Sequence, residues 1–233
     1  MLKFNLGGKH FEFSPKLLVM AGFTGRNRAA IQAHIDELAA NGIASTSTFP
    51  AYYHKLADRI TQAETLEALD SSDHTGEGEY CVFRHEGRFY LTPGSDHTDR
   101  KAEVHNVLKS KQIYPSIVGR EVWAYEEVKD HWNQVELKSW ATVNGERRLY
   151  QRFAMADLLS PPELMDWFKI KLTDPGEMEG VMIFSGTMAG LFTLNYAEKF
   201  EVSLEDPVLR RELRSAYTLR SVADAYLNGR AEI

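Results

Sequence analysis

Two short acidic segments lie one expected hairpin apart near the middle of the chain. Glu77-Gly-Glu79 leads into an apolar strand expected over 79–83, and a returning strand over 88–91 leads to Asp96. Residues i and i+2 of a strand point to the same face, so Glu77 and Glu79 project together. Three carboxylates in one place repel one another unless a cation neutralises them. The residues therefore predict an all-oxygen site for Mg²⁺, Mn²⁺ or Ca²⁺.

Each of these segments also has an ordinary explanation. Glu-x-Glu is common on solvated strand faces, and Asp96-His97-Thr98-Asp99 could be a polar turn. The order of the pieces favours the metal site. His97 points away from Asp96 on a strand, and imidazole suits a hard cation poorly, so we expect it either to support a ligand from outside the coordination sphere or to be structural. Asp99 and Arg100 could pair with each other.

The order of these motifs resembles the metal-binding core of the fumarylacetoacetate hydrolase superfamily, in which Glu-x-Glu precedes Gly-x-Asp-Val-Ser/Thr-x-Arg-Asp. Here the matching residues are Glu77-Gly-Glu79-Tyr-Cys-Val-Phe83 and Gly94-Ser-Asp96-His-Thr-Asp99-Arg100. The resemblance extends over roughly residues 20–220 and is strongest to a bacterial branch of unknown function. Further matches are Lys111-Gln-Ile-Tyr-Pro115, Asn144-Gly145-Glu146, Ile183-Phe-Ser-Gly186-Thr187 and Lys199-Phe-Glu-Val-Ser-Leu204.

His34 and Glu37 are three residues apart on a helix expected over 27–40, so they share a face. One interpretation is a helix-surface histidine with a chance acidic neighbour. The other is a base dyad in which Glu37 orients His34 and the imidazole activates water. The resemblance favours the dyad, because the hydrolases of the superfamily carry His-x-x-Glu in a short helical lid. The Asn-Tyr that usually precedes that motif is absent here.

The resemblance also implies roles for residues that contact substrate. Lys111 would help the metal stabilise an enolate oxygen, although a solvated lysine is the alternative. Gly186 and Thr187 would hydrogen-bond a substrate carboxylate or oxo group, and Arg100 would bind a substrate carboxylate. The usual proline after this threonine is Met188 here, so the substrate loop departs most from the family pattern.

Composition bounds the class of protein. With 43% hydrophobic and 26% charged residues, the 233-residue chain can bury a core and is not disordered. The net charge of −6 argues against nucleic-acid and anionic-membrane surfaces, which need basic patches. The single Cys81 lies in an apolar strand, fits a reducing compartment and predicts a cytoplasmic protein. No apolar run is long enough to span a membrane.

The fold class that we expect is α+β and β-rich, a fumarylacetoacetate hydrolase-like β-sandwich roll with a few short helices. We expect a single domain over 1–233, with a hairpin and helix segment of about 1–60 packed on a β-roll core of about 61–220. Asn144-Gly145 predicts a type I′ hairpin, and Ser160-Pro-Pro-Glu163 predicts the start of the one helix expected after residue 79. Other expected strands are 2–6, 10–13, 16–21, 136–143, 147–153, 181–184, 200–204 and 213–219.

These observations lead to a functional expectation. The chain would be a divalent-metal-dependent hydrolase or lyase that acts on a small anionic 2-oxo or 1,3-dicarbonyl compound through a metal-stabilised enolate. The alternatives are a 2-oxoacid decarboxylase, isomerase or hydratase on the same fold, or a non-catalytic metal- or ligand-binding protein. Aromatic residues over 123–132 and 217–227, together with a family that looks dimeric, predict a twofold homodimer.

Overall fold

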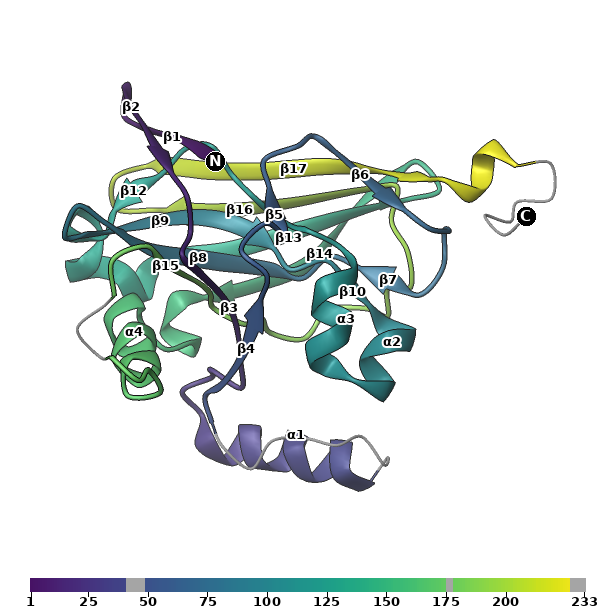
Figure 1. Cartoon of the computed structure of the whole chain (residues 1–233), viewed down its shortest axis with the longest axis horizontal. Helices are drawn as coiled ribbons and strands as arrows, with labels where there is room; N and C mark the ends of the chain where they lie inside the picture. Colours follow the sequence, from purple (N-terminus) through teal and green to yellow (C-terminus); the bar gives the residue numbers. More distant parts are fainter. Residues whose placement is uncertain (41–48, 175–177, 227–233) are drawn as a thin grey trace.

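Two β-sheets form the body of the protein, and the four α-helices of the described residues lie along the lower side of them in the view of Figure 1. The structure is a computed structural model of the whole chain, and it describes residues 1–40, 49–174 and 178–226, except the side chains of residues 30, 34 and 37–40. The helices are α1 (Arg28–Ala40), α2 (Arg100–His105), α3 (Val107–Ile113) and α4 (Pro161–Lys169).

The larger sheet has the strand order β4-β3-β15-β8-β9-β11-β5, with β12 paired to β9. The central hairpin of β8 and β9 is the element on which the acidic residues depend. Its register places Glu79 opposite Gly94, which confirms the two expected strands and extends them. The strands of this sheet are β3 (Leu17–Gly22), β4 (Ala51–Lys55), β5 (Ile60–Thr61), β8 (Gly78–His85), β9 (Arg88–Ser95), β11 (Ser116–Val118), β12 (Trp123–Ala124) and β15 (Val181–Phe184).

The second sheet has five strands in the order β14-β13-β16-β17-β6. Its β13–β14 hairpin turns at Asn144 and Gly145, whose φ angles of 52° and 76° fit the predicted type I′ turn. The strands are β6 (Thr65–Ala68), β13 (Glu136–Val143), β14 (Glu146–Ala154), β16 (Lys199–Asp206) and β17 (Arg211–Ser221). Two small pairs complete the structure: β1 (Leu2–Leu6) with β2 (Lys9–Phe13), and β7 (His74–Thr75) with β10 (Thr98–Asp99).

The helices confirm two sequence predictions and contradict a third. Helix α1 covers the predicted range, and α4 begins with the predicted capping box, in which Glu163 accepts hydrogen bonds from the Ser160 main chain and hydroxyl. The expectation of one helix after residue 79 is wrong, because α2 and α3 also form there. Asp99 accepts a hydrogen bond from the Ala102 N–H and caps α2, and Asn106 caps α3 in the same way.

The main core lies between the two sheets, and a second apolar cluster lies under the β1–β2 hairpin. Cys81 is buried in that second cluster, as expected. Trp123 and Trp132 are buried in the main core, so the aromatic residues of 123–132 are explained by packing within one chain. The homodimer therefore stays a prediction, which light scattering tests against the 26.5 kDa chain mass. Residue 227 of the second aromatic stretch lies outside the described residues.

No helix in the described part of the chain combines the length and the apolar character needed to cross a membrane.

Candidate metal centre

The structure brings the three predicted acidic residues together. Glu77, Glu79 and Asp96 each offer a carboxylate oxygen, and these atoms lie within 4.8 Å of one another. The β8–β9 hairpin positions them, because the Asp96 N–H donates a hydrogen bond to the Glu77 carbonyl at 3.1 Å just beyond the last strand pair. Glu79 and Asp96 are buried, and Glu77 is half-buried at the edge of a cavity. The predicted trio therefore exists as a spatial cluster.

Two lysines contact this cluster from different sides. The Lys111 ammonium lies 2.8 Å from Asp96 Oδ2 and 3.0 Å from Glu77 Oε2. The Lys55 ammonium lies 3.0 Å from Asp96 Oδ1 and donates to the Ser116 hydroxyl at 2.8 Å. Asp96 is thus held between two buried cations, whereas Lys111 bridges two of the three acids.

The carboxylates differ in how well the protein stabilises their charge. Burial raises the pKa of Glu79 well above its usual range, and the neighbouring Asp96 and Glu77 carboxylates raise it further. Burial acts in the same direction on Asp96, but Lys111 and Lys55 outweigh it and lower the pKa of that carboxyl. The protein's own cations therefore stabilise the charge of Asp96 and leave that of Glu79 unfavourable.

The poorly stabilised charge of Glu79 is what a site for a divalent cation would show in the absence of the ion. Three convergent carboxylate oxygens are hard ligands that suit Mg²⁺ or Mn²⁺, and such an ion would stabilise the ionised form of Glu79. Glu77 fits the same set, because Arg100 and Lys111 overcome the effect of its burial and lower its pKa. The residues present therefore fit the metal that the sequence predicts.

Lys111 is a fixed positive charge at this site. Burial alone would lower its pKa, but Asp96, Glu77 and Glu103 outweigh burial and raise the pKa well above the usual range. In the metal-free protein its ammonium therefore keeps its proton near neutral pH, which suits electrostatic stabilisation.

The predicted substrate loop lies beside Glu79. The Gly186 N–H donates to Glu79 Oε2 at 2.8 Å, so this backbone group supports a candidate ligand. Its φ of 76° favours glycine, and an added Cβ would lie 2.9 Å from the Ala21 carbonyl oxygen. The Thr187 hydroxyl donates to the Gly78 carbonyl and accepts from the Gln151 amide, both at 2.7 Å. Roles of Gly186 and Thr187 toward substrate stay predictions.

Arg100 contacts the cluster and does not pair with Asp99, whose side chain caps helix α2. Its guanidinium donates to Glu77 at 3.0 Å, to Glu103 at 2.8 Å and to the Thr75 hydroxyl at 2.8 Å. These contacts place Arg100 at the mouth of the site with a defined orientation. Its binding of a substrate carboxylate stays a prediction.

The predicted dyad lies on helix α1, but the His34 and Glu37 side chains lie outside the described residues. Ile31 of the same helix is buried and lines the cavity. The dyad stays a prediction.

A cavity of about 930 Å³ opens over the cluster. Glu77, Glu79 and Lys111 line it, and Met20, Phe23, Ile31, Val104 and Val107 are among its apolar lining residues. The predicted residues Arg100, Gly186 and Thr187 also line it, as do Tyr53, Glu103, Tyr150 and Gln151, which the sequence analysis missed.

Lys55 is the most consequential of the residues that sequence analysis missed. It ends the short strand β4, whose antiparallel pairing with β3 places it opposite Leu18. Its side chain is fully buried against Asp96, which lies 41 residues away in the chain. No spacing rule links the two positions, so the contact becomes visible only in the folded chain. Gln151 is similar, because a glutamine in a strand gives no signal that it will hold Gly78 and Thr187.

A family model described as "Protein of unknown function (DUF2848)" matches residues 21–217. No curated protein sequence matches the chain. Among solved structures, the protein Cg1458 is 14% identical with a TM-score of 0.63, covering 93% of this chain and 83% of its own.

A second solved structure is that of 2-keto-3-deoxy-D-arabinonate dehydratase complexed with magnesium and 2,5-dioxopentanoate. It is 14% identical with a TM-score of 0.61, covering 89% of this chain and 74% of its own. These likenesses show a shared fold, and they confirm the predicted β-rich, fumarylacetoacetate hydrolase-like fold class.

Proposed function

We propose, from the premise that the chain belongs to the family described as "Protein of unknown function (DUF2848)", that it is a divalent-metal-dependent enzyme acting on a small anionic 2-oxo or 1,3-dicarbonyl compound. The observation that carries this proposal is the carboxylate trio with the Lys111 ammonium against it, at the end of a cavity. The fold shared with a dehydratase bound to magnesium and 2,5-dioxopentanoate supports it.

Glu77, Glu79 and Asp96 would hold the metal. A bound divalent cation supplies Lewis-acid stabilisation of the enolate that forms beside a carbonyl group. Lys111 adds a fixed positive charge where negative charge develops, and it needs no rearrangement because Asp96 and Glu77 already orient it. Tyr53, whose pKa is raised by burial, keeps its phenol proton and offers a hydrogen-bond donor in the cavity wall.

Arg100, Gly186 and Thr187 are our proposed substrate-binding residues. A guanidinium fits a carboxylate with paired N–H donors, and Arg100 is oriented by Glu77 and Glu103. Arg100→Lys should therefore raise KM for an anionic substrate more than it lowers kcat, because Lys loses the planar pair of donors.

Two reaction types remain, and they differ in whether they need an activated water. Hydrolysis requires an activated water, for which His34 and Glu37 are our proposed residues. Dehydration, decarboxylation or isomerisation requires no water attack. The described residues of the cavity wall include no histidine. The reaction type therefore depends on His34.

The metal is tested first by thermal unfolding in Mg²⁺ or Mn²⁺, with oxalate as a planar dianion that resembles a 2-oxo-acid enolate. Metal should raise Tm because it binds only the folded state, and oxalate should raise it further only when metal is present. Glu79→Gln should abolish both shifts. The control Glu201→Gln, at a half-buried glutamate of strand β16 that pairs with Arg147, should keep them. An unchanged wild-type Tm over millimolar metal would refute the metal site.

The reaction is tested with a panel of acylpyruvates, oxaloacetate and 2-keto-3-deoxy sugar acids, each with Mg²⁺ or with a chelator. If hydrolysis is the reaction, His34→Ala should lower kcat by roughly 10²–10⁴-fold while metal binding persists. Full activity of His34→Ala would instead assign the chain to the non-hydrolytic class. Absence of metal-dependent turnover across the panel, with intact metal and oxalate binding, would favour a ligand-binding protein.

A further inference from the structure

A line of buried polar side chains runs from the protein surface to the main chain of Glu77. The links are His74 Nε2 to the Asp70 carbonyl at 2.8 Å, His74 Nδ1 to His97 Nε2 at 2.8 Å, and His97 Nδ1 to the Tyr217 hydroxyl at 2.9 Å. The Tyr217 hydroxyl lies 3.0 Å from Ser95 Oγ, which accepts the Glu77 N–H at 3.2 Å. We call these four side chains, His74, His97, Tyr217 and Ser95, the relay.

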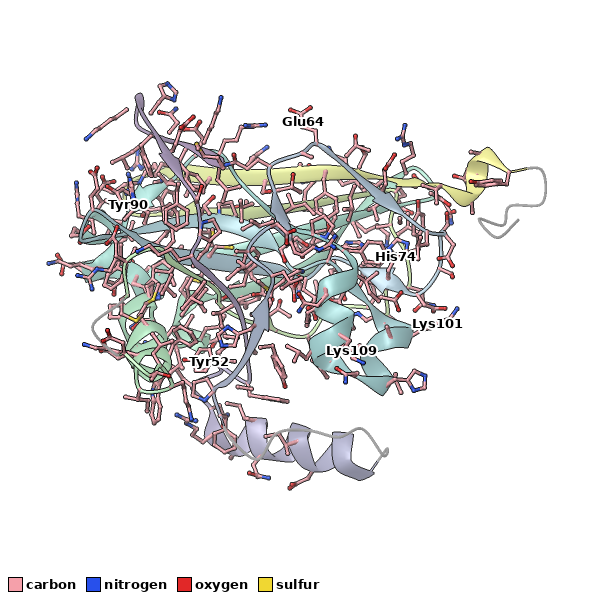
Figure 2. The ribbon with its side chains drawn as sticks, in the orientation of Figure 1. Tyr52, Glu64, His74, Tyr90, Lys101 and Lys109 are labelled. Atoms are coloured by element: carbon pink, nitrogen blue, oxygen red, sulfur yellow. The ribbon has the colours of Figure 1, made fainter. Side chains whose placement is uncertain are left out.

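All four relay side chains are at most 2% exposed. Burial of this much polar surface is costly unless each group has a hydrogen-bond partner, and here each one has two. In Figure 2 the labelled His74 lies between the sheets and the helices that carry Lys101 and Lys109, which is the side of the molecule where β7 and β10 pair. The relay therefore belongs to the interior and is satisfied along its whole length.

One end of the relay fixes its direction. The Asp70 carbonyl can only accept, so His74 carries a proton on Nε2, and in the relay that we infer its Nδ1 is the acceptor. His97 then donates from Nε2 and accepts at Nδ1 from the Tyr217 hydroxyl. Tyr217 in turn accepts from the Ser95 hydroxyl, which leaves a Ser95 lone pair for the Glu77 N–H.

The other end of the relay joins the two ligand-bearing segments. The Glu77 N–H donates to the Ser95 side chain, and the Glu77 carbonyl accepts from the Asp96 N–H at 3.1 Å. These two bonds clamp the backbone of one candidate ligand to that of the other. Gly76 makes room for the clamp, since an added Cβ would lie 2.7 Å from the Tyr217 hydroxyl and 2.5 Å from Phe200.

We infer that Tyr217 and His97 are positioning residues that set the spacing of Glu77 and Asp96 by orienting the Ser95 hydroxyl. This inference rests on the proposed metal site. Partners of metal ligands outside the coordination sphere typically change metal affinity by about 10–100-fold when they are removed. The relay would give the C-terminal strand β17 a direct effect on a site built by β8 and β9.

The test is a titration of the metal-free protein with Mn²⁺, in which free Mn²⁺ is followed by electron paramagnetic resonance. Tyr217→Phe should raise the Mn²⁺ Kd by about 10-fold or more. The matched control is Tyr80→Phe, which removes an equally buried hydroxyl that donates to the Leu159 carbonyl. Both variants should lose Tm in the absence of metal, but only Tyr217→Phe should lose Mn²⁺ affinity.

A second variant shows whether Tyr217 acts through Ser95. Ser95→Ala removes the acceptor of the Glu77 N–H and leaves the Tyr217–His97 bond intact, so it should fold and should weaken Mn²⁺ binding similarly. The double variant should then bind no more weakly than the weaker single variant. If the losses of Mn²⁺ affinity multiply in the double variant, or if either single variant keeps the wild-type Kd, the inference is overturned while the proposed function stands.

Mn²⁺ binding by the wild-type protein and the tautomers of the two histidines provide two further tests. If the wild-type protein binds no Mn²⁺, the proposed function and the inference fall together. Long-range ¹⁵N–¹H spectra should show both His74 and His97 as Nε2–H tautomers, and an Nδ1–H tautomer at His97 would reverse the relay and overturn the inference.

Discussion

Two charged clusters in this protein use the same residue types in opposite settings. The buried cluster contains Glu77, Glu79, Asp96, Lys55 and Lys111. The outer-face cluster, on the solvent side of the five-stranded sheet, contains Glu136, Lys138, Arg152 and Glu205. The outer-face cluster balances two acids with two bases. The buried cluster has three acids and two lysines, and at its edge Arg100 contacts Glu77 while Glu103 contacts Arg100 and Lys111, so one negative charge remains in excess.

Burial decides what each cluster can do. Arg152 is 56% exposed, so water already stabilises its charge and its ion pair with Glu136 adds little. Lys55 and Asp96 are at most 1% exposed in their side chains, so each depends on the other for the stabilisation that water would give. An excess of buried negative charge is relieved either by a bound cation or by protonation of Glu79, whose pKa burial and the neighbouring carboxylates raise. The contrast separates a solvated surface from a candidate metal site.

The largest expected effect comes from breaking the buried pair. Lys55→Met should destabilise the metal-free protein by about 3 kcal/mol, because it leaves one Asp96 oxygen without a cationic partner. Urea denaturation measures this loss. The double variant Lys55→Met with Asp96→Asn should cost less than Lys55→Met alone, since no uncompensated charge remains. A loss below about 1 kcal/mol for Lys55→Met would show that this pair is not isolated from water.

A smaller effect of opposite sign is expected at Glu79. Glu79→Gln removes the carboxylate that the protein's own cations stabilise least, and the amide oxygen can still accept the Gly186 N–H. The metal-free variant should therefore be more stable than wild type by on the order of 1 kcal/mol at neutral pH. In millimolar Mn²⁺ the order should reverse, because only the wild type gains metal stabilisation. A metal-free variant less stable than wild type would contradict this explanation.

The smallest effect is expected on the outer face. Arg152→Ala should change the free energy of unfolding by less than about 1 kcal/mol, and its coupling to Glu136→Ala should be about 0.5 kcal/mol. A double-mutant cycle measures the coupling. A coupling as large as that of the buried pair would erase the distinction between the clusters.

The two ion pairs should also differ in how strongly salt weakens their coupling energies. Raising NaCl to about 1 M shortens the screening length to about 3 Å, which should remove most of the Arg152–Glu136 coupling. The coupling between Lys55 and Asp96 should change much less, because solvent ions do not reach a buried pair. Equal salt dependence of the two couplings would mean that both pairs are solvated.

Local sequence signals predicted the elements that carry the candidate ligands. Alternating and apolar runs predicted β8 and β9, and Asn144-Gly145 predicted the β13–β14 hairpin, because turn chemistry and side-chain period act over a few residues. The hairpin then delivered Glu77, Glu79 and Asp96 to one place. Helices α2 and α3 were not predicted although their caps, Asp99 and Asn106, are local signals, because helices of 6 and 7 residues are too short to show an apolar period.

Only the tertiary structure decided which side chains surround those carboxylates and stabilise their charge. Lys55 lies 41 residues from Asp96, and Tyr217 lies 120 residues from His97, so neither contact follows from spacing along the chain. Each depends on which strands become neighbours and which faces they bury. The sequence by itself determined that three acids would meet at one hairpin. The packing of β4, α3 and β17 around that hairpin determined which charges are paired, because burial removes water as the alternative partner.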